Sequence, residues 1–189
     1  DFGLANIDIM LGSASAYNLK SVLSGEKELH EIIQEGYNGV KFISGGNGIY
    51  ELLNMDDDSV TRILDKMTGL GGLADTVIVD TGAGINSHIL QLILASTEVV
   101  VVTTPEPTSL VDAYAMIKTI CEARYTSDIH LVINRAQSGR EAENAGTSLS
   151  VVVYRNLGIT LSVLGSVAYD PEVFRSISQF TPLLIRHPR

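Results

Sequence analysis

Asp80 is the residue of this sequence whose type and position most directly suggest chemistry. It follows an apolar run at residues 76–79 and precedes the small residues Thr-Gly-Ala-Gly at 81–84. A carboxylate at a strand end suits Mg²⁺, which takes few protein oxygens and keeps several waters, and small residues let a backbone approach a phosphate closely. Asp80 is therefore a candidate metal ligand. The alternative is that it caps a helix beginning near Asn86, because Asp is a favoured N-cap.

The elements that would position this carboxylate alternate between strand and helix. Apolar, β-branched runs predict strands at residues 40–44, 76–79, 98–103, 129–134 and 162–167, and helix-length segments lie at 56–68, 86–95, 109–124, 140–157 and 171–179. Near-continuous apolar runs are typical of strands buried on both faces of a parallel sheet. The alternation predicts an α/β fold with a doubly wound, mostly parallel sheet and helices on both faces. The chain is expected to form one domain over residues 1–189.

In such a sheet the ligand lies beyond the carboxyl ends of the strands. The loops that follow the predicted strands should therefore open on one side. They contain Asp80, the segment 104–107, the pair Asn134-Arg135 and the pair Asp170-Pro171. The sequence thus predicts a polar cluster on one rim of the sheet.

Composition excludes several functional classes. The 189 residues are 45% hydrophobic and carry a formal net charge of −9, with a pI near 4.8, so a general nucleic-acid binder is not expected. No apolar stretch approaches the length of about 18 residues needed to span a bilayer. The single cysteine, Cys121, lies in a helical pattern and is interpreted as a small buried or half-buried hydrophobe in a reduced, cytosolic protein.

Four segments carry a resemblance to a known family: residues 1–8, 38–46, 80–85 and 103–114. The first and third resemble the two switch regions of the MinD/ParA-type (deviant-Walker) ATPases, and the last is similar to the FlhG subfamily of flagellar-number regulators. The resemblance implies a P-loop NTPase-like fold that uses ATP and Mg²⁺, with Asp80 on the metal. The family's first strand and its Gly-Lys-Thr or Gly-Lys-Ser phosphate loop have no counterpart here, which suggests an N-terminally truncated domain.

The opening segment is similar to the family pattern Asp-x-Asp-x-Gly-Leu-x-Asn. Asp1 takes the place of the second acid, and the resemblance implies that it orients the attacking water, since phosphoryl transfer depends mainly on positioning. Asn6 matches the family's nucleotide-side Asn. Asp8 also matches a family position, but the favoured interpretation is an N-cap for the turn at residues 9–11.

The resemblance places the adenine base near Asn134-Arg135 and Asp170-Pro171. An Asn amide offers both a donor and an acceptor to a purine edge, and backbone groups of the second pair would help to hold the base. The plainer alternatives are a polar strand end for Asn134 and a first helical turn for Pro171. Residues 104–109 are expected to line an ATP-dependent dimer interface.

The implied function is an ATP switch that forms a homodimer with ATP and acts with the GTPase FlhF, or with basal-body components, on flagellar number or placement. The location implied is cytoplasmic, and the full-length protein would reach the inner face of the cell membrane through an amphipathic tail that these residues lack. The parent protein would be an ATPase. Because loop amides and lysine supply most phosphate contacts and no Gly-Lys dipeptide occurs, this fragment is expected to bind ATP weakly or not at all.

Two alternatives remain open. A ParA-like partition ATPase would need a basic stripe for DNA, which 13 Lys and Arg residues make harder to build. A non-hydrolysing scaffold that keeps the fold and binds protein partners is the other, and a phosphate loop in the parent sequence would exclude it.

Overall fold

The computed structural model describes residues 7–10, 16–46 and 56–186. The chain divides into two compact units: unit 1 comprises Asp1–Ala83 and Pro171–Arg189, and unit 2 comprises Gly84–Asp170. Each unit is described by itself. The expected single domain over residues 1–189 stays a prediction.

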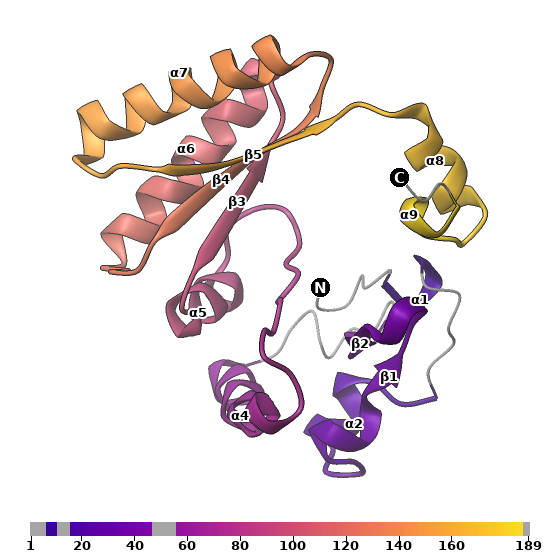
Figure 1. The fold of residues 1–189 in the computed structure, drawn as a ribbon. Helices are drawn as coiled ribbons and strands as arrows, with labels where there is room; N and C mark the ends of the chain where they lie inside the picture. Colours follow the sequence, from indigo (N-terminus) through magenta and orange to yellow (C-terminus); the bar gives the residue numbers. More distant parts are fainter. Residues whose placement is uncertain (1–6, 11–15, 47–55, 187–189) are drawn as a thin grey trace. The chain divides into compact units, whose positions relative to one another are not determined.

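Unit 2 is built on a parallel sheet of three strands. The strands are β3 (Val99–Thr103), β4 (Ile129–Ala136) and β5 (Ser162–Ala168), in the order β3-β4-β5. Parallel neighbours need a crossover connection, and the helices α6 (Pro107–Glu122) and α7 (Gly139–Leu157) supply the two that are required. Helix α5 (Ser87–Ala95) precedes β3 (Figure 1). The predicted strands and helices of this region are confirmed.

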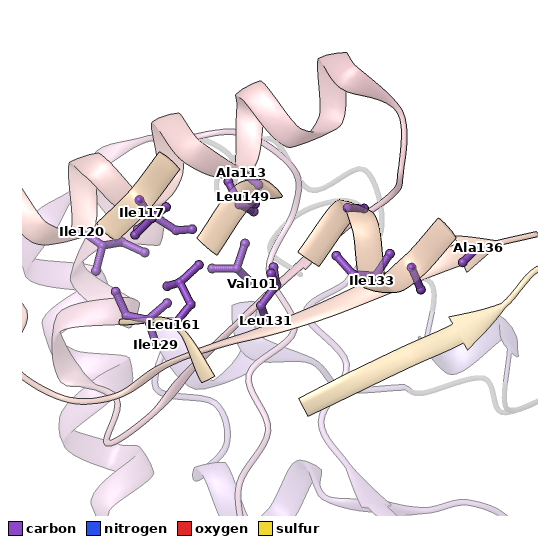
Figure 2. Close-up of a cluster of buried hydrophobic side chains, with 13 residues drawn as sticks. Val101, Ala113, Ile117, Ile120, Ile129, Leu131, Ile133, Ala136, Leu149 and Leu161 are labelled. Atoms are coloured by element: carbon purple, nitrogen blue, oxygen red, sulfur yellow. The ribbon is translucent and has the colours of Figure 1, made fainter. Parts of the chain in front are cut away.

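The core of unit 2 lies between the sheet and helices α6 and α7 (Figure 2). Alternate side chains of β4 are buried there, because successive residues of a strand point to opposite faces. Each fully buried aliphatic side chain contributes about 1.5–3 kcal/mol. The core consists of Val101, Ala113, Ile117, Ile120, Ile129, Leu131, Ile133, Ala136, Ala142, Ala145, Leu149, Val153 and Leu161.

The opposite side of β3 differs from expectation. The apolar run predicted burial on both faces, yet Val100 is 50% and Val102 59% exposed, while Val101 between them is buried. The reason is that α6 and α7 both pack on the face that Val101 shares. Of the helices belonging to unit 2, these two form the layer that buries the sheet.

Unit 1 is a set of short elements around a smaller core. Its helices are α1 (Ile7–Met10), α2 (Leu19–Leu23), α4 (Asp57–Thr68), α8 (Pro171–Ser178) and α9 (Leu183–Arg186), with 3-10 helices at Leu29–Ile32, Tyr37–Gly39 and Gly69–Gly72. The helix predicted at residues 56–68 is confirmed as α4, and the Asp56 side chain caps it by accepting the Ser59 N–H at 2.8 Å. Its core consists of Leu19, Val22, Leu29, Ile32, Val60, Ile63 and Leu70.

One predicted strand is absent, and another is shorter than expected and pairs differently. Only Lys41–Phe42 (β2) forms from the run at residues 40–44, and it pairs antiparallel with Gln34–Glu35 (β1) instead of joining a parallel sheet. Residues 76–79 are not a strand, and Ile78 is 88% exposed. A strand requires a neighbour for its backbone hydrogen bonds, and none of the pairings among the described residues involves 76–79.

Over the described parts of the chain, no helix combines the length and apolar character that crossing a bilayer would demand.

Candidate functional site

The carboxyl ends of β3, β4 and β5 gather three loops at one edge of the unit 2 sheet. The loops are residues 104–106, the end of β4 at Asn134–Ala136, and residues 169–170. The Tyr169 N–H donates to the Ala136 carbonyl at 2.9 Å, so the last two loops stay adjacent beyond the strands. This edge is where an α/β sheet holds its ligand.

Arg135 occupies a bulge at the end of β4. Between Asn134 and Ala136 the strand advances two residues while β5 advances one, from Val167 to Ala168. Arg135 takes a left-handed backbone conformation with φ of 59°, and its N–H donates to the Asn134 Oδ1 at 2.9 Å. A non-glycine residue in this region costs about 1–3 kcal/mol, and such strain and such bulges cluster at functional sites.

The bulge brings the Arg135 guanidinium against the ring of Tyr169. The guanidinium carbon lies 5.8 Å from the ring centroid, within the range of a cation–π interaction. Tyr169 is 46% exposed, so much of its ring remains accessible. A planar cation and an aromatic ring therefore lie together at the rim.

The loop after β3 adds a carboxylate to the same edge. The pKa of Glu106 is held below its ordinary value, chiefly by a hydrogen bond with the Thr104 side chain, then by its own backbone N–H and by the charge of Arg135. The loop is anchored by Thr103, which is buried and donates from Oγ1 to the Ser109 carbonyl at 2.9 Å. At neutral pH this edge carries the cation of Arg135 and a compensating anion.

A cavity of about 440 Å³ lies beside this loop, between the start of α6 and the first three turns of α7. The α7 start is fixed by reciprocal bonds: the Ser138 Oγ accepts the Glu141 N–H at 3.2 Å, and the Glu141 carboxylate accepts the Gln137 N–H at 2.6 Å. The cavity is lined by Pro105, Leu110, Ser138, Arg140, Glu141, Asn144, Ala145 and Ser148.

The structure brings together three of the predicted site residues: Asn134, Arg135 and Asp170 lie at the carboxyl edge of unit 2. Pro171 begins α8 and belongs to unit 1, in keeping with the first-turn alternative. Asn134 lies on the sheet face opposite α6 and α7, since it alternates with the buried Ile133. Its Oδ1 accepts one hydrogen bond and keeps a second lone pair, and its amide nitrogen offers two donors.

Asp80 lies in unit 1, on an exposed segment without regular secondary structure. The alternative that it caps the following helix is wrong, because the Asn86 side chain caps α5 by accepting the Ile89 N–H at 2.9 Å. Asp1 and Asn6 lie outside the described residues. Their roles stay predictions, as does that of Asp80 on a metal.

Asp8 is not an N-cap. Helix α1 begins at Ile7, so Asp8 is inside its first turn. Its carboxylate accepts the Ser44 hydroxyl at 3.1 Å, and Ser44 in turn accepts the Gly46 N–H at 3.2 Å. The acid therefore links α1 to the turn that follows β2.

Tyr169 was not among the predicted site residues, and Glu106 was expected only as part of the segment 104–109. The sequence does carry a signal for Tyr169, an aromatic residue directly before Asp170 in a loop already expected at the rim. For Glu106 the signal is weaker, because the Pro-Glu-Pro run at residues 105–107 is explained by the start of α6, where Pro107 is the first helical residue.

Comparison with known proteins gives relatives along the chain, although no protein-family model matches. The chain is 29% identical over 189 residues to the antiactivator FleN of Pseudomonas aeruginosa, covering 100% of this chain and 68% of FleN. It is 33% identical over 169 residues to the flagellum site-determining protein YlxH of Helicobacter pylori, covering 88% of this chain and 56% of YlxH. Among solved structures, MinD of Pyrococcus horikoshii in complex with Mg-ADP superimposes with a TM-score of 0.78 at 19% identity, covering 100% of this chain and 74% of that one.

The sequence comparisons support a MinD/ParA-type family of ATPases for this chain, and the solved structures show that its α/β fold is that of MinD and ParA proteins. Within the family its sequence lies close to the FlhG group, to which FleN and YlxH belong. The predicted family is therefore confirmed.

Proposed function

We propose that the protein is an ATP-switched regulator of MinD/FlhG type that controls flagellar number or placement through ATP-dependent dimerisation and partner binding. The observation that carries the proposal is the cluster of Asn134, Arg135 and Asp170 at the carboxyl edge of a parallel sheet, in a chain similar to an antiactivator and a flagellum site-determining protein. An edge of this kind, with a planar amide and a strained loop, suits a nucleotide base.

The residues present fit a purine nucleotide. The amide nitrogen of Asn134 is available as a donor, and the backbone of the loop at residues 169–170 stays close to β4 through the Tyr169–Ala136 hydrogen bond. Bound ATP would supply the γ-phosphoryl group whose presence or loss sets the state of the switch. In this chain, the residues that would bind the base lie in unit 2.

Asp80 fits a magnesium site by its chemistry. Its carboxylate is a hard oxygen donor on an exposed segment, and the small residues that follow it leave room for phosphate oxygens and waters. Solved MinD of P. horikoshii carries Mg-ADP, which supports the same cofactor pair here. Asp1 would orient the attacking water and Asn6 would contact the nucleotide, as the family resemblance implies.

Dimerisation and partners complete the proposal. A MinC:MinD complex is known from Aquifex aeolicus, so a relative of this fold does bind a protein partner. For this chain the proposed partners are a second copy when ATP is bound, the GTPase FlhF or basal-body components, and the inner face of the cell membrane through a tail in the full-length protein. The net charge of −9 argues against DNA as the partner.

Calorimetric titration of ATP with and without Mg²⁺ tests the proposal, on these 189 residues and on the whole gene product. We expect Mg²⁺-dependent binding by the whole product and weak or no binding of ATP by the 189 residues. In the whole product, Asp80→Ala should remove the Mg²⁺ dependence and the ATP turnover, while the matched variant Asp75→Ala, on the same exposed segment, should keep both. An absence of ATP binding by the whole product would exclude the switch and favour a scaffold that binds only proteins.

A further inference from the structure

We propose that Tyr169, backed by Arg135, is a stacking platform for the base of the bound nucleotide. The inference rests on the proposed function, because it names a recognition element of the same site. Asn134 is expected to contact the edge of the base, and Tyr169 would contact its flat face. Nothing in the predicted set of site residues assigns a role to this tyrosine.

The first support is the way in which the ring is held. The bulge at Arg135 and its left-handed φ of 59° direct the guanidinium to 5.8 Å from the Tyr169 centroid. The backbone of Tyr169 is fixed to Ala136 by a hydrogen bond of 2.9 Å. A ring fixed by its backbone and covered on one side by a planar cation loses little further freedom when a ligand stacks on it.

The second support is the part of the Tyr169 ring that remains exposed. Tyr169 is 46% exposed even with Arg135 against it, which is enough surface for a heterocycle to cover. Base–aromatic stacking tolerates any base, since every base has a π-face. The Asn134 Oδ1 already accepts the Arg135 N–H, so part of the hydrogen-bonding capacity of this amide is used. Stacking on Tyr169 would add a second contact with the base.

The third support is the local charge, which separates a base platform from a phosphate site. An arginine binds phosphate through charge-assisted, often bidentate hydrogen bonds, which a neighbouring carboxylate opposes by repelling the phosphate. Here the charge of Arg135 acts on Glu106, whose pKa is lowered and whose carboxylate is therefore ionised at neutral pH. The anion repels phosphate and compensates the guanidinium, which leaves the aromatic face as the main attraction.

The test uses ligands that separate base from phosphate. Adenosine, AMP and ribose 5-phosphate are titrated into the whole gene product, and binding is followed by NMR of ring-labelled tyrosine. We expect adenosine and AMP to shift the Tyr169 ring signals and ribose 5-phosphate not to do so. Tyr169→Ala should weaken adenosine binding about 5- to 150-fold, and Tyr169→Phe should stay within about 2-fold, since the ring is kept.

Two further variants keep the result interpretable. Tyr154→Ala removes a tyrosine that is 63% exposed on α7, and it should leave adenosine binding unchanged. Arg135→Gly removes the cation but accepts the left-handed backbone, so the fold is not strained, and it should weaken adenosine about 2- to 5-fold.

The outcomes distinguish this inference from the proposed function. If adenosine and AMP bind the chain equally well with and without the Tyr169 ring, the platform is refuted and the nucleotide site stands. If ribose 5-phosphate binds with the same affinity as AMP, and Arg135→Gly abolishes the binding of both compounds, the edge is an anion site and the platform is refuted. If the whole gene product binds no adenine compound, the base site in unit 2 fails and the platform fails with it.

Discussion

Ser44 links two parts of unit 1 through a side chain that is almost entirely buried. It is 1% exposed, its hydroxyl donates to the Asp8 carboxylate at 3.1 Å, and its oxygen accepts the Gly46 N–H at 3.2 Å. The first bond reaches α1, and the second closes the turn after β2. Ser44→Ala removes both bonds with almost no change in volume, so its effect on stability measures the link itself.

The magnitude follows from what each partner loses. The buried Gly46 N–H is left without its acceptor, which costs about 1–3 kcal/mol. The Asp8 bond is only partly buried, so its carboxylate can be rehydrated and the loss is about 0.5–1.5 kcal/mol. Such terms are not additive for groups in one network, and we expect a total loss of about 2 kcal/mol. For a chain of this size that corresponds to a fall in Tm of about 4–8 °C.

Urea unfolding followed by far-UV circular dichroism measures the loss. The control is Ser24→Ala, an exposed serine whose hydroxyl donates to the Ser21 carbonyl at 3.1 Å, and we expect a change of about 0.5 kcal/mol or less. A double-mutant cycle with Asp8→Ala should give a coupling energy of about 0.5–1.5 kcal/mol. If Ser44→Ala behaves like the control, or if the coupling is below about 0.3 kcal/mol, the link does not exist in solution.

Three further predictions concern unit 2. Gly158→Ala should lower the free energy of unfolding by about 1 kcal/mol, because Gly158 ends α7 with φ of 71°. Gly139, in the first turn of the same helix, has open space around it, so Gly139→Ala should raise the free energy of unfolding by up to about 1 kcal/mol. Thermal unfolding compares the two variants. Ile117→Ala should lower the free energy of unfolding by about 2–5 kcal/mol, since Ile117 is fully buried in the core; a loss below about 1 kcal/mol would contradict the packing. Thr104→Val should raise the pKa of Glu106 toward its ordinary 4.5, as measured by carbon-detected NMR titration. A carboxylate with a lowered pKa stabilises the fold above its ordinary pKa and loses that contribution as the pH falls through the folded-state pKa. The loss of stability in acid that is due to Glu106 should therefore be smaller in the variant.

The elements of unit 2 could be predicted because their signals are local. Each strand is a short apolar run, and each helix carries its own start signal, such as Pro107 for α6 and Ser138 for α7. The crossover helices then enforce parallel pairing, since sequential strands joined by a helix have few other arrangements. Apolar runs alternating with helix-length segments were sufficient here without knowledge of long-range contacts.

The runs at residues 76–79 and 40–44 show that local sequence signals are not sufficient to predict a strand and its pairing. The run at residues 76–79 has high strand propensity, but propensity describes a fit to a pleated, half-buried surface and does not supply a partner. The run at 40–44 does find a partner, β1, in Gln34–Glu35. That dipeptide is polar and carries no strand signal of its own. Pairing is decided by the neighbour, which the run itself does not encode.

The candidate site was predictable to the level of loops, but its geometry was not. The rule that ligands lie at carboxyl strand ends brought Asn134 and Asp170 to one rim, as the structure has them. The residue type of Arg135 gives no sign of its left-handed φ, since the residues that favour this conformation are Gly, Asn and Asp. The contact with Tyr169 depends on that φ and so was missed with it.

The bulge nevertheless follows from the sequence once strand parity is considered. Counting from the buried Leu131 and Ile133, an unbroken strand would direct Arg135 into the core and Ala136 away from it. Burying a guanidinium without a partner costs several kcal/mol, whereas a left-handed residue costs about 1–3 kcal/mol. One extra residue at position 135 reverses the assignment: Ala136 fills the core at 3% exposure and Arg135 is released to the rim. The same choice that protects the core therefore places the cation against Tyr169, and an arginine at a core-parity position near a strand end is itself a signal for such a bulge.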